Sequence, residues 1–168
     1  MEEKKYIRYT FVLIAATTLI RMYLASITGL GVDEAHYVQY ALKPALSYYD
    51  HPLLVSYLIR FFIVIIGKSL LSVRMPAIIA GIGTALLLFL IGRKLYGVQA
   101  GFWSVVLFNC IPLFSAIGGI TVVPETILCL FYLALIFLTW QIYQTKNLYL
   151  WYFTGIITGL ALLTKYTA

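Results

Sequence analysis

Carboxylates and imidazoles inside otherwise apolar segments are the residues of this chain that could do chemistry. Four of the six acidic residues lie in or beside segments rich in Tyr, Leu and Ile, and both histidines lie near them. These residues are Asp33, Glu34, Asp50 and Glu125, with His36 and His51. A carboxylate in such surroundings can act as a general base, and a histidine can supply positive charge beside a leaving anion. Any one of these residues could simply be a solvated loop residue. The presence of four carboxylates and two histidines in apolar segments is harder to explain in that way.

Residues 33–36 read DEAH, the motif with which nucleic-acid helicases hold magnesium against a nucleotide. That chemistry also requires a GxxxxGK[ST] phosphate loop on a parallel sheet, and the sequence contains neither the loop nor the strand pattern. The 12 basic residues are spread along the chain and several flank apolar segments. Such spacing is typical of membrane topology signals, so we expect no nucleic-acid partner.

The composition indicates which elements position the candidate residues. Of the 168 residues, 62% are hydrophobic, whereas only 12 are basic and 6 acidic. Uncharged runs cover 18 residues at 75–92, 30 at 95–124, 20 at 126–145 and 18 at 147–164. Each run can cross about 30 Å of hydrocarbon as a helix. Disordered, coiled-coil, disulfide-rich and ordinary soluble proteins fit poorly, and the expected fold class is all-α, a polytopic transmembrane helix bundle.

About five spans are predicted, at residues 9–28, 73–91, 100–119, 126–143 and 148–168. The basic head before the first span favours a retained helix with a cytoplasmic N-terminus. Threading from there places Arg93, Lys94 and Lys146 in the cytoplasm, as the positive-inside rule requires. The same threading brings all four candidate carboxylates to the outer face. We therefore predict an integral multi-pass protein of the cytoplasmic membrane, surrounded by membrane lipids, with its active-site loop outside.

Residues 29–72 form a long first outer loop, which we expect to contain amphipathic helices along the membrane surface. In the first of them, residues 33–46, the polar side carries Asp33, His36, Tyr37 and Tyr40. A second helix, interfacial or partly embedded, is predicted to begin at residues 50–52, with Asp50 as its cap, and to run to about residue 66. A short true span is the alternative for this segment. Arg21 and Arg74 lie near outer helix ends and are expected to be snorkelling anchors.

Short motifs follow one another along the chain in a distinctive order. They are DEAHY at 33–37, YYDHPL at 48–53, VRMP at 73–76, GRKLYG at 92–97, VPE at 123–125 and LTKYT at 163–167. This order closely resembles the N-terminal half of GT-C superfamily membrane glycosyltransferases. The nearest branch is similar to the dolichyl-phosphate-mannose protein mannosyltransferase-like group (glycosyltransferase family 39 type), related to the enzymes that add aminoarabinose to lipid A. Because GT-C enzymes are much longer, we expect residues 1–168 to be an N-terminal transmembrane module, a fragment inactive by itself.

The resemblance implies transfer of a sugar from a polyprenyl-phosphate carrier to an acceptor hydroxyl on a protein, lipid or glycan, with inversion at the anomeric carbon. Such a transfer needs a carboxylate that takes the proton of the acceptor hydroxyl. It also needs cations or hydrogen-bond donors that stabilise the departing phosphate. Phosphate is already a good leaving group, so no acid catalyst is required.

On the family pattern Asp33 matches the catalytic base, and Glu34 orients either the acceptor or the start of its helix. His51 occupies a position where related enzymes place a cation near the carrier phosphate. Lys165, deep in the last predicted span, is a candidate for the same task because a buried lysine is costly without a partner. The sugar, the acceptor or a divalent metal ion, the one cofactor considered, could be bound by Asp50, Glu125 and His36.

Two departures from the family pattern and one alternative function stand beside this interpretation. Glu125 stands where Asp is usual, and residues 50–53 contain one proline where two are common. A small transporter or a non-catalytic membrane subunit would also have several spans and outer carboxylates. A transporter is expected to place an ionisable residue in mid-membrane, and Lys165 is the only candidate for that position.

Overall fold

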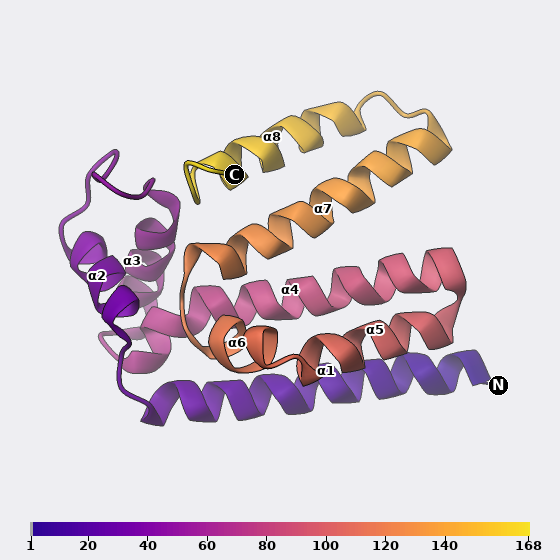
Figure 1. Ribbon diagram of the computed structural model, residues 1–168, viewed down its shortest axis with the longest axis horizontal. Coiled ribbons are helices and arrows are strands. Elements are labelled where there is room, and N and C mark those ends of the chain that lie inside the picture. Colours follow the sequence, from indigo (N-terminus) through magenta and orange to yellow (C-terminus); the bar gives the residue numbers. More distant parts are fainter. Residues whose placement is uncertain (1) are drawn as a thin grey trace.

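The computed structural model is built of helices, the longest of which lie side by side (Figure 1). It describes residues 2–168, apart from the side chains of residues 116–118. Within these described residues, three helices are long and apolar enough to cross a membrane, namely α1 (Glu2–Ile27), α4 (Leu70–Tyr96) and α7 (Pro124–Thr145). Three shorter apolar helices accompany them in this part of the chain, α3 (Leu54–Ile66), α5 (Val98–Cys110) and α8 (Leu150–Leu162). The prediction of an all-α membrane helix bundle is confirmed.

Two short helices, α2 (Val32–Leu42) and α3 (Leu54–Ile66), cover one end of the bundle, which we call the α2–α3 end (Figure 1). α2 is shorter than predicted because Pro44 disfavours helical backbone at the residue before it. The N-cap of α3 is Leu53, so the expectation that Asp50 caps this helix is wrong. The buried sides of α2 and α3 pack against α4 in one core, which contains Tyr37, Ala41, Val55, Ile59, Val73 and Ala77.

The helix predicted over residues 100–119 is interrupted. α5 ends at Cys110, and Ile111 has extended backbone, which the ring of the following Pro112 favours. A π-helical turn, η1 (Leu113–Ile117), and a short helix, α6 (Gly118–Ile120), follow. The chain therefore reaches α7 through irregular backbone, and this irregular segment forms one wall of the site described below.

The opposite end of the bundle contains the N-terminus and the connections from α4 to α5 and from α7 to α8 (Figure 1). There Arg93 donates from Nη2 to Oε1 of Glu3 at 2.7 Å, and both side chains are exposed. Arg93, Lys94 and Lys146 thus lie at the end away from α2 and α3, in the arrangement that the threading of the spans predicts.

α4 and α5 form a close helical hairpin. Gly97 joins them with a φ of 91°, a left-handed conformation that favours glycine. A Cβ added to Gly101 would lie 2.6 Å from the carbonyl oxygen of Phe89, and one added to Gly92 would lie 2.8 Å from the Cα of Gly101. The backbones of the two helices therefore approach as closely as small residues allow.

Replacing Gly101 by Ala is expected to destabilise the folded protein by about 1–3 kcal/mol, because the new methyl group must push α4 and α5 apart. Gly155→Ala in α8 is a matched control, since nothing lies within 4 Å of a Cβ at that position. There Ala is expected to stabilise the helix by up to about 1 kcal/mol. Denaturant unfolding of the purified protein in micelles measures both changes, and effects of the same sign would contradict the close approach.

Candidate active site

A buried ion pair between Glu34 of α2 and Arg74 of α4 organises the α2–α3 end. Arg74 donates from Nη2 to Oε2 of Glu34 at 2.7 Å and from Nε to Oε1 at 2.8 Å. Each side chain is only 1% exposed. The backbone N–H groups of Gly31 and Val122 donate to the same carboxylate, each at 3.0 Å. One carboxylate therefore connects the start of α2, the first turns of α4 and the loop before α7.

The Glu34 carboxylate is ionised and fully engaged inside the protein. Burial alone would raise its pKa, but the hydrogen bonds from Arg74, Gly31 and Val122 outweigh burial, so the pKa lies below its ordinary value. The bond from Gly31 fixes the start of α2, which is the second of the two roles expected for Glu34. Its oxygen atoms have no access to a substrate, so the acceptor-orienting role has no geometric support.

Arg74 also closes the end of α1. Its Nη1 donates to the carbonyl oxygen of Ala25 at 3.1 Å, and its Nη2 donates to that of Gly29 at 2.7 Å. Carbonyl groups at a helix C-terminus have no partner within the helix. Arg21 is similarly interior, 5% exposed, and donates to Oδ1 of Asn109 at 3.0 Å. The expectation that Arg21 and Arg74 are snorkelling anchors is therefore wrong.

Asp33 differs from its neighbour Glu34 in both exposure and partners. It lies in the first turn of α2 with an exposed side chain. Within the part of the chain that the structure describes, its carboxylate makes no hydrogen bond or ion pair. The ion pair of Glu34 nevertheless fixes its backbone, because the two residues are adjacent. The backbone of Asp33 is therefore fixed, while its carboxylate remains free to contact a substrate.

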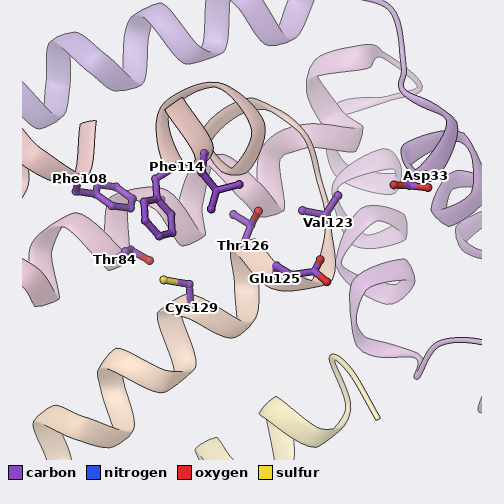
Figure 2. A pocket seen from close by; sticks show the side chains of 10 residues that line it. Asp33, Thr84, Phe108, Phe114, Val123, Glu125, Thr126 and Cys129 are labelled. Atoms are coloured by element: carbon purple, nitrogen blue, oxygen red, sulfur yellow. The ribbon is translucent and has the colours of Figure 1, made fainter. Parts of the chain in front are cut away.

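A cavity of about 340 Å³ runs from Asp33 into the bundle (Figure 2). Asp33 and Glu125 lie at one end of it. The other end is lined by Thr84, Phe108 and Cys129. α4, the end of α5, η1 and α7 all contribute walls, so the break in the predicted helix 100–119 shapes this cavity. Most of the lining is apolar.

A second hollow, open and about 640 Å³ in volume, shares Asp33 with the cavity. Its other polar residues include His36, Gln39 and Asp50. The hydroxyl of Tyr40 donates to Oδ1 of Asp50 at 2.6 Å, and Nε2 of His36 lies 2.7 Å from that hydroxyl and 3.1 Å from Oδ2 of Asp50. Asp50 and His36 therefore form one exposed hydrogen-bonded cluster with Tyr40.

The hydrogen bond between Tyr40 and Asp50 shifts the pKa of both side chains. It lowers the pKa of Asp50 and, as the largest of several causes, raises the pKa of Tyr40 to about 12. A carboxyl group whose pKa is lowered by folding stabilises the protein above its ordinary pKa of about 4. That contribution is lost as the pH falls through the lowered pKa. We therefore expect the cluster to contribute to stability at neutral pH and to contribute less in acid.

Removing the Tyr40 hydroxyl in Tyr40→Phe is expected to raise the pKa of Asp50 towards the ordinary aspartate value, because the carboxylate loses its shortest hydrogen bond. Tyr49→Phe is the control, since the Tyr49 side chain is fully exposed. A ¹³C NMR titration of the carboxyl carbons in labelled protein measures both variants. An unchanged Asp50 pKa in Tyr40→Phe would show that this bond does not form.

Lys165 forms an ion pair with Glu125, with Nζ of the lysine 2.6 Å from Oε1 of the glutamate. α8 ends at Leu162, so the expectation that Lys165 lies deep in a span is wrong. It lies instead beside the first turn of α7, and the mid-membrane position that a transporter would need is not filled by this residue. The Lys165 and Glu125 side chains are 31% and 60% exposed, so a ligand can reach both.

His51 and Tyr37 pack together where the candidate carboxylates converge. Their ring centroids lie 5.2 Å apart, and Nδ1 of His51 is buried without a hydrogen-bond partner among the described residues. Burial raises the pKa of Tyr37, and the negative charges of Glu125, Asp33 and Asp50 raise it further. Tyr37 is a site residue that the sequence analysis did not single out. The prediction that Tyr37 lies on the polar side of residues 33–46 is wrong, because the structure buries its ring in the core against α4.

Among the residues that the structure describes, no three His, Cys, Asp or Glu side chains are grouped so that they could hold a metal ion. Asp50 and His36 share one cluster, whereas Glu125 pairs with Lys165. The described residues thus offer no grouped set of three such ligands for the divalent ion that was one of the possible ligands, and no step below depends on one.

Comparison with known families gives one match. The sequence profile described as dolichyl-phosphate-mannose-protein mannosyltransferase matches residues 50–168. No curated protein and no solved structure matches the chain. The matched region begins at Asp50 and contains Arg74, Glu125 and Lys165, and it spans well over half of the chain.

Proposed function

The chain belongs to the dolichyl-phosphate-mannose-protein mannosyltransferase family, and we propose that it transfers a sugar from a polyprenyl-phosphate donor to an acceptor hydroxyl with Asp33 as general base. The family is one of membrane glycosyltransferases that use such donors in general. The proposal adds the base, the inversion at the anomeric carbon and the location of the site at the outer face of the cytoplasmic membrane.

The availability of Asp33 is the observation that carries the proposal. Of the four carboxylates at the α2–α3 end, Glu34 is paired with Arg74, Asp50 with Tyr40 and Glu125 with Lys165. Asp33 has no such partner among the described residues, and it lines both the cavity and the open hollow. A general base must have a lone pair free to take the acceptor proton, and the exposed, unpaired carboxylate of Asp33 supports this role.

The chemistry requires two bond changes at the anomeric carbon and one proton transfer. The acceptor oxygen attacks that carbon on the face opposite the phosphate while its proton moves to the Asp33 carboxylate. The bond from the anomeric carbon to the phosphate oxygen breaks, and polyprenyl phosphate leaves with the electron pair. Lys165 and His51 supply the positive charge and hydrogen-bond donor that stabilise this phosphate. To contact the phosphate, Lys165 either gives up its ion pair with Glu125 or binds the phosphate and Glu125 together.

The distribution of charge along the bundle supports an outer-face site. The candidate carboxylates lie at the α2–α3 end, and Arg93, Lys94 and Lys146 lie at the opposite end (Figure 1). Basic residues beside membrane spans favour the cytoplasm, so the N-terminus is cytoplasmic and the site faces outward. The acceptor is then a protein, lipid or glycan that is present at the outer face of the cytoplasmic membrane.

A transfer assay with the protein expressed from its full reading frame tests the proposal. Membranes containing the protein are supplied with a polyprenyl-phosphate sugar labelled at the anomeric carbon, and the product is examined by NMR. The expected result is transfer of the label to an acceptor with inverted anomeric configuration. A product of retained configuration, or a label that never leaves the carrier, would contradict the proposal.

A further inference from the structure

We propose that α4 and α7 bind one anionic phospholipid of the cytoplasmic leaflet, with its headgroup at Lys94 and Lys146 and an acyl chain along α7. The site lies at the end of the bundle away from Asp33, so the inference goes beyond the proposed function. It is carried by an apolar groove, by two lysines held over aromatic rings beside that groove, and by the charge of these lysines.

Two adjoining hollows lie along α7 near the end of the bundle that contains the N-terminus, where α4 and α7 diverge (Figure 1). The first, of about 60 Å³, lies between the two helices and is lined by Lys94 and by apolar and aromatic side chains. The second, of about 540 Å³, is open and includes Tyr143. Ile136 and Trp140 line both hollows. The two therefore form one mainly apolar groove, which we call the Lys94 groove.

Two lysines at the ends of these helices lie over aromatic rings that line the Lys94 groove. Nζ of Lys94 is 4.9 Å from the ring centroid of Trp140 and 5.6 Å from that of Phe137. Nζ of Lys146, the residue after α7, is 4.5 Å from the ring centroid of Tyr143. Because Trp140 and Tyr143 are three residues apart, they occupy neighbouring positions on one face of α7. The two ammonium groups therefore flank the same part of the groove.

The charge of these two lysines is not neutralised by a carboxylate. Among the residues that the structure describes, no ion pair includes Lys94 or Lys146. Glu3, at the same end of the bundle, pairs with Arg93, and the described lining of the two hollows contains no acidic residue. An aromatic ring attracts a cation without cancelling its charge. Both ammonium groups can therefore bind an anion.

The apolar groove beside the lysines favours a phospholipid over a soluble anion. α4 and α7 are both long and apolar enough to cross a membrane, and basic residues beside such helices favour the cytoplasmic side. In a bilayer, hydrocarbon has to fill the Lys94 groove, because an empty groove would lose contacts with its lining. An acyl chain supplies that hydrocarbon and carries a phosphate at the level of the lysines. Basic pockets between membrane helices on the cytoplasmic side bind anionic head groups in this way.

Native mass spectrometry of the protein released from micelles tests the headgroup contact. The protein is mixed with equal amounts of phosphatidylglycerol and phosphatidylcholine that have the same acyl chains. We expect the wild type to retain one phosphatidylglycerol in preference to phosphatidylcholine, and Lys94→Gln to weaken its binding about fivefold, as for one basic side chain near a membrane surface. Lys5→Gln is the matched control, because Nζ of Lys5 also lies over a ring, 5.7 Å from the centroid of Tyr9, but Lys5 lines neither hollow. Equal weakening in both variants, or equal retention of the two lipids by the wild type, would overturn the inference.

Filling the groove tests the position of the acyl chain. Ile136 lines both hollows and is 57% exposed, so Ile136→Trp fills the groove and keeps both lysines. We expect this variant to weaken phosphatidylglycerol binding as strongly as Lys94→Gln does. Ile156→Trp on α8 is the control, since Ile156 is 60% exposed and lines neither hollow. Its binding is expected to match that of the wild type.

Two results would overturn the acyl-chain contact or the choice of lipid. Unchanged binding in Ile136→Trp would show that no chain lies in the Lys94 groove. Stronger retention of polyprenyl phosphate than of phosphatidylglycerol by the wild type would assign the groove to a carrier lipid instead. Because none of these measurements uses sugar transfer, either result leaves the proposed role of Asp33 intact.

Discussion

Arg74→Met is expected to lower the free energy of unfolding by about 3–5 kcal/mol, the largest effect on stability of any single change considered. The substitution leaves the Glu34 carboxylate buried without its cation, and uncompensated buried charge is strongly unfavourable. It also removes the donors that hold the carbonyl groups at the end of α1. Denaturant unfolding in micelles measures the loss, and transfer activity is expected to fall with it because Asp33 loses its fixed position.

A double variant separates the ion pair from simple loss of packing. Arg74→Met with Glu34→Gln removes both charges, and it is expected to be more stable than either single variant. Arg93→Met is the matched control, because its partner Glu3 is exposed and surface ion pairs contribute about 0–1 kcal/mol. If Arg74→Met and Arg93→Met change stability equally, the Glu34–Arg74 pair does not organise the α2–α3 end.

Asp33→Asn is expected to reduce kcat for sugar transfer by about 10²–10⁴-fold, the range typical of a lost general base. The amide is nearly the same size as the carboxylate but cannot take a proton from the acceptor. The KM of the donor is expected to stay the same, since the phosphate contacts involve Lys165 and His51. Unfolding in micelles should show a stability close to that of the wild type, because Asp33 has no internal partner to lose.

Glu3→Gln is the control for Asp33→Asn. It also replaces an exposed carboxylate by an amide, but at the opposite end of the bundle, beside Arg93. Transfer by Glu3→Gln is expected to match that of the wild type. If the two variants lose the same fraction of activity, the effect belongs to membrane insertion or expression and Asp33 is not the base.

The sequence predicts the fold class and the end of the bundle at which the candidate carboxylates lie. It does not predict which residues these carboxylates pair with. The spacing of charges predicts the membrane-spanning helices, and it also predicts that Arg93, Lys94 and Lys146 lie together at one end of the bundle. The interior roles of Glu34 and Arg74 do not follow, because forty residues separate them and only packing brings them together. An arginine near a helix end has the same local pattern whether it extends to the interface or folds inward.

The details of the cavity are likewise set by tertiary structure. Pro112 is visible in the sequence, yet a proline inside an apolar run can kink a membrane helix or end it. Here it ends α5, and η1 then forms a wall of the cavity. The reversal of the chain after Leu162 brings Lys165 back to Glu125, and no periodicity in residues 148–168 indicates that contact. Tyr37 shows the converse case, a residue that the pattern placed on the polar side of its helix but that the structure buries in the core. Three carboxylates from separate segments raise its pKa there.

The role of Asp33 as general base is tested most directly by varying the acidity of the acceptor. Transfer by the wild type and Asp33→Asn is compared, in single turnovers, for an alkyl alcohol and its fluorinated analogue of the same chain length. A more acidic hydroxyl needs less help in losing its proton, so the loss of rate in Asp33→Asn is expected to be at least tenfold smaller for the fluorinated acceptor. An equal loss with both acceptors would contradict proton transfer to Asp33.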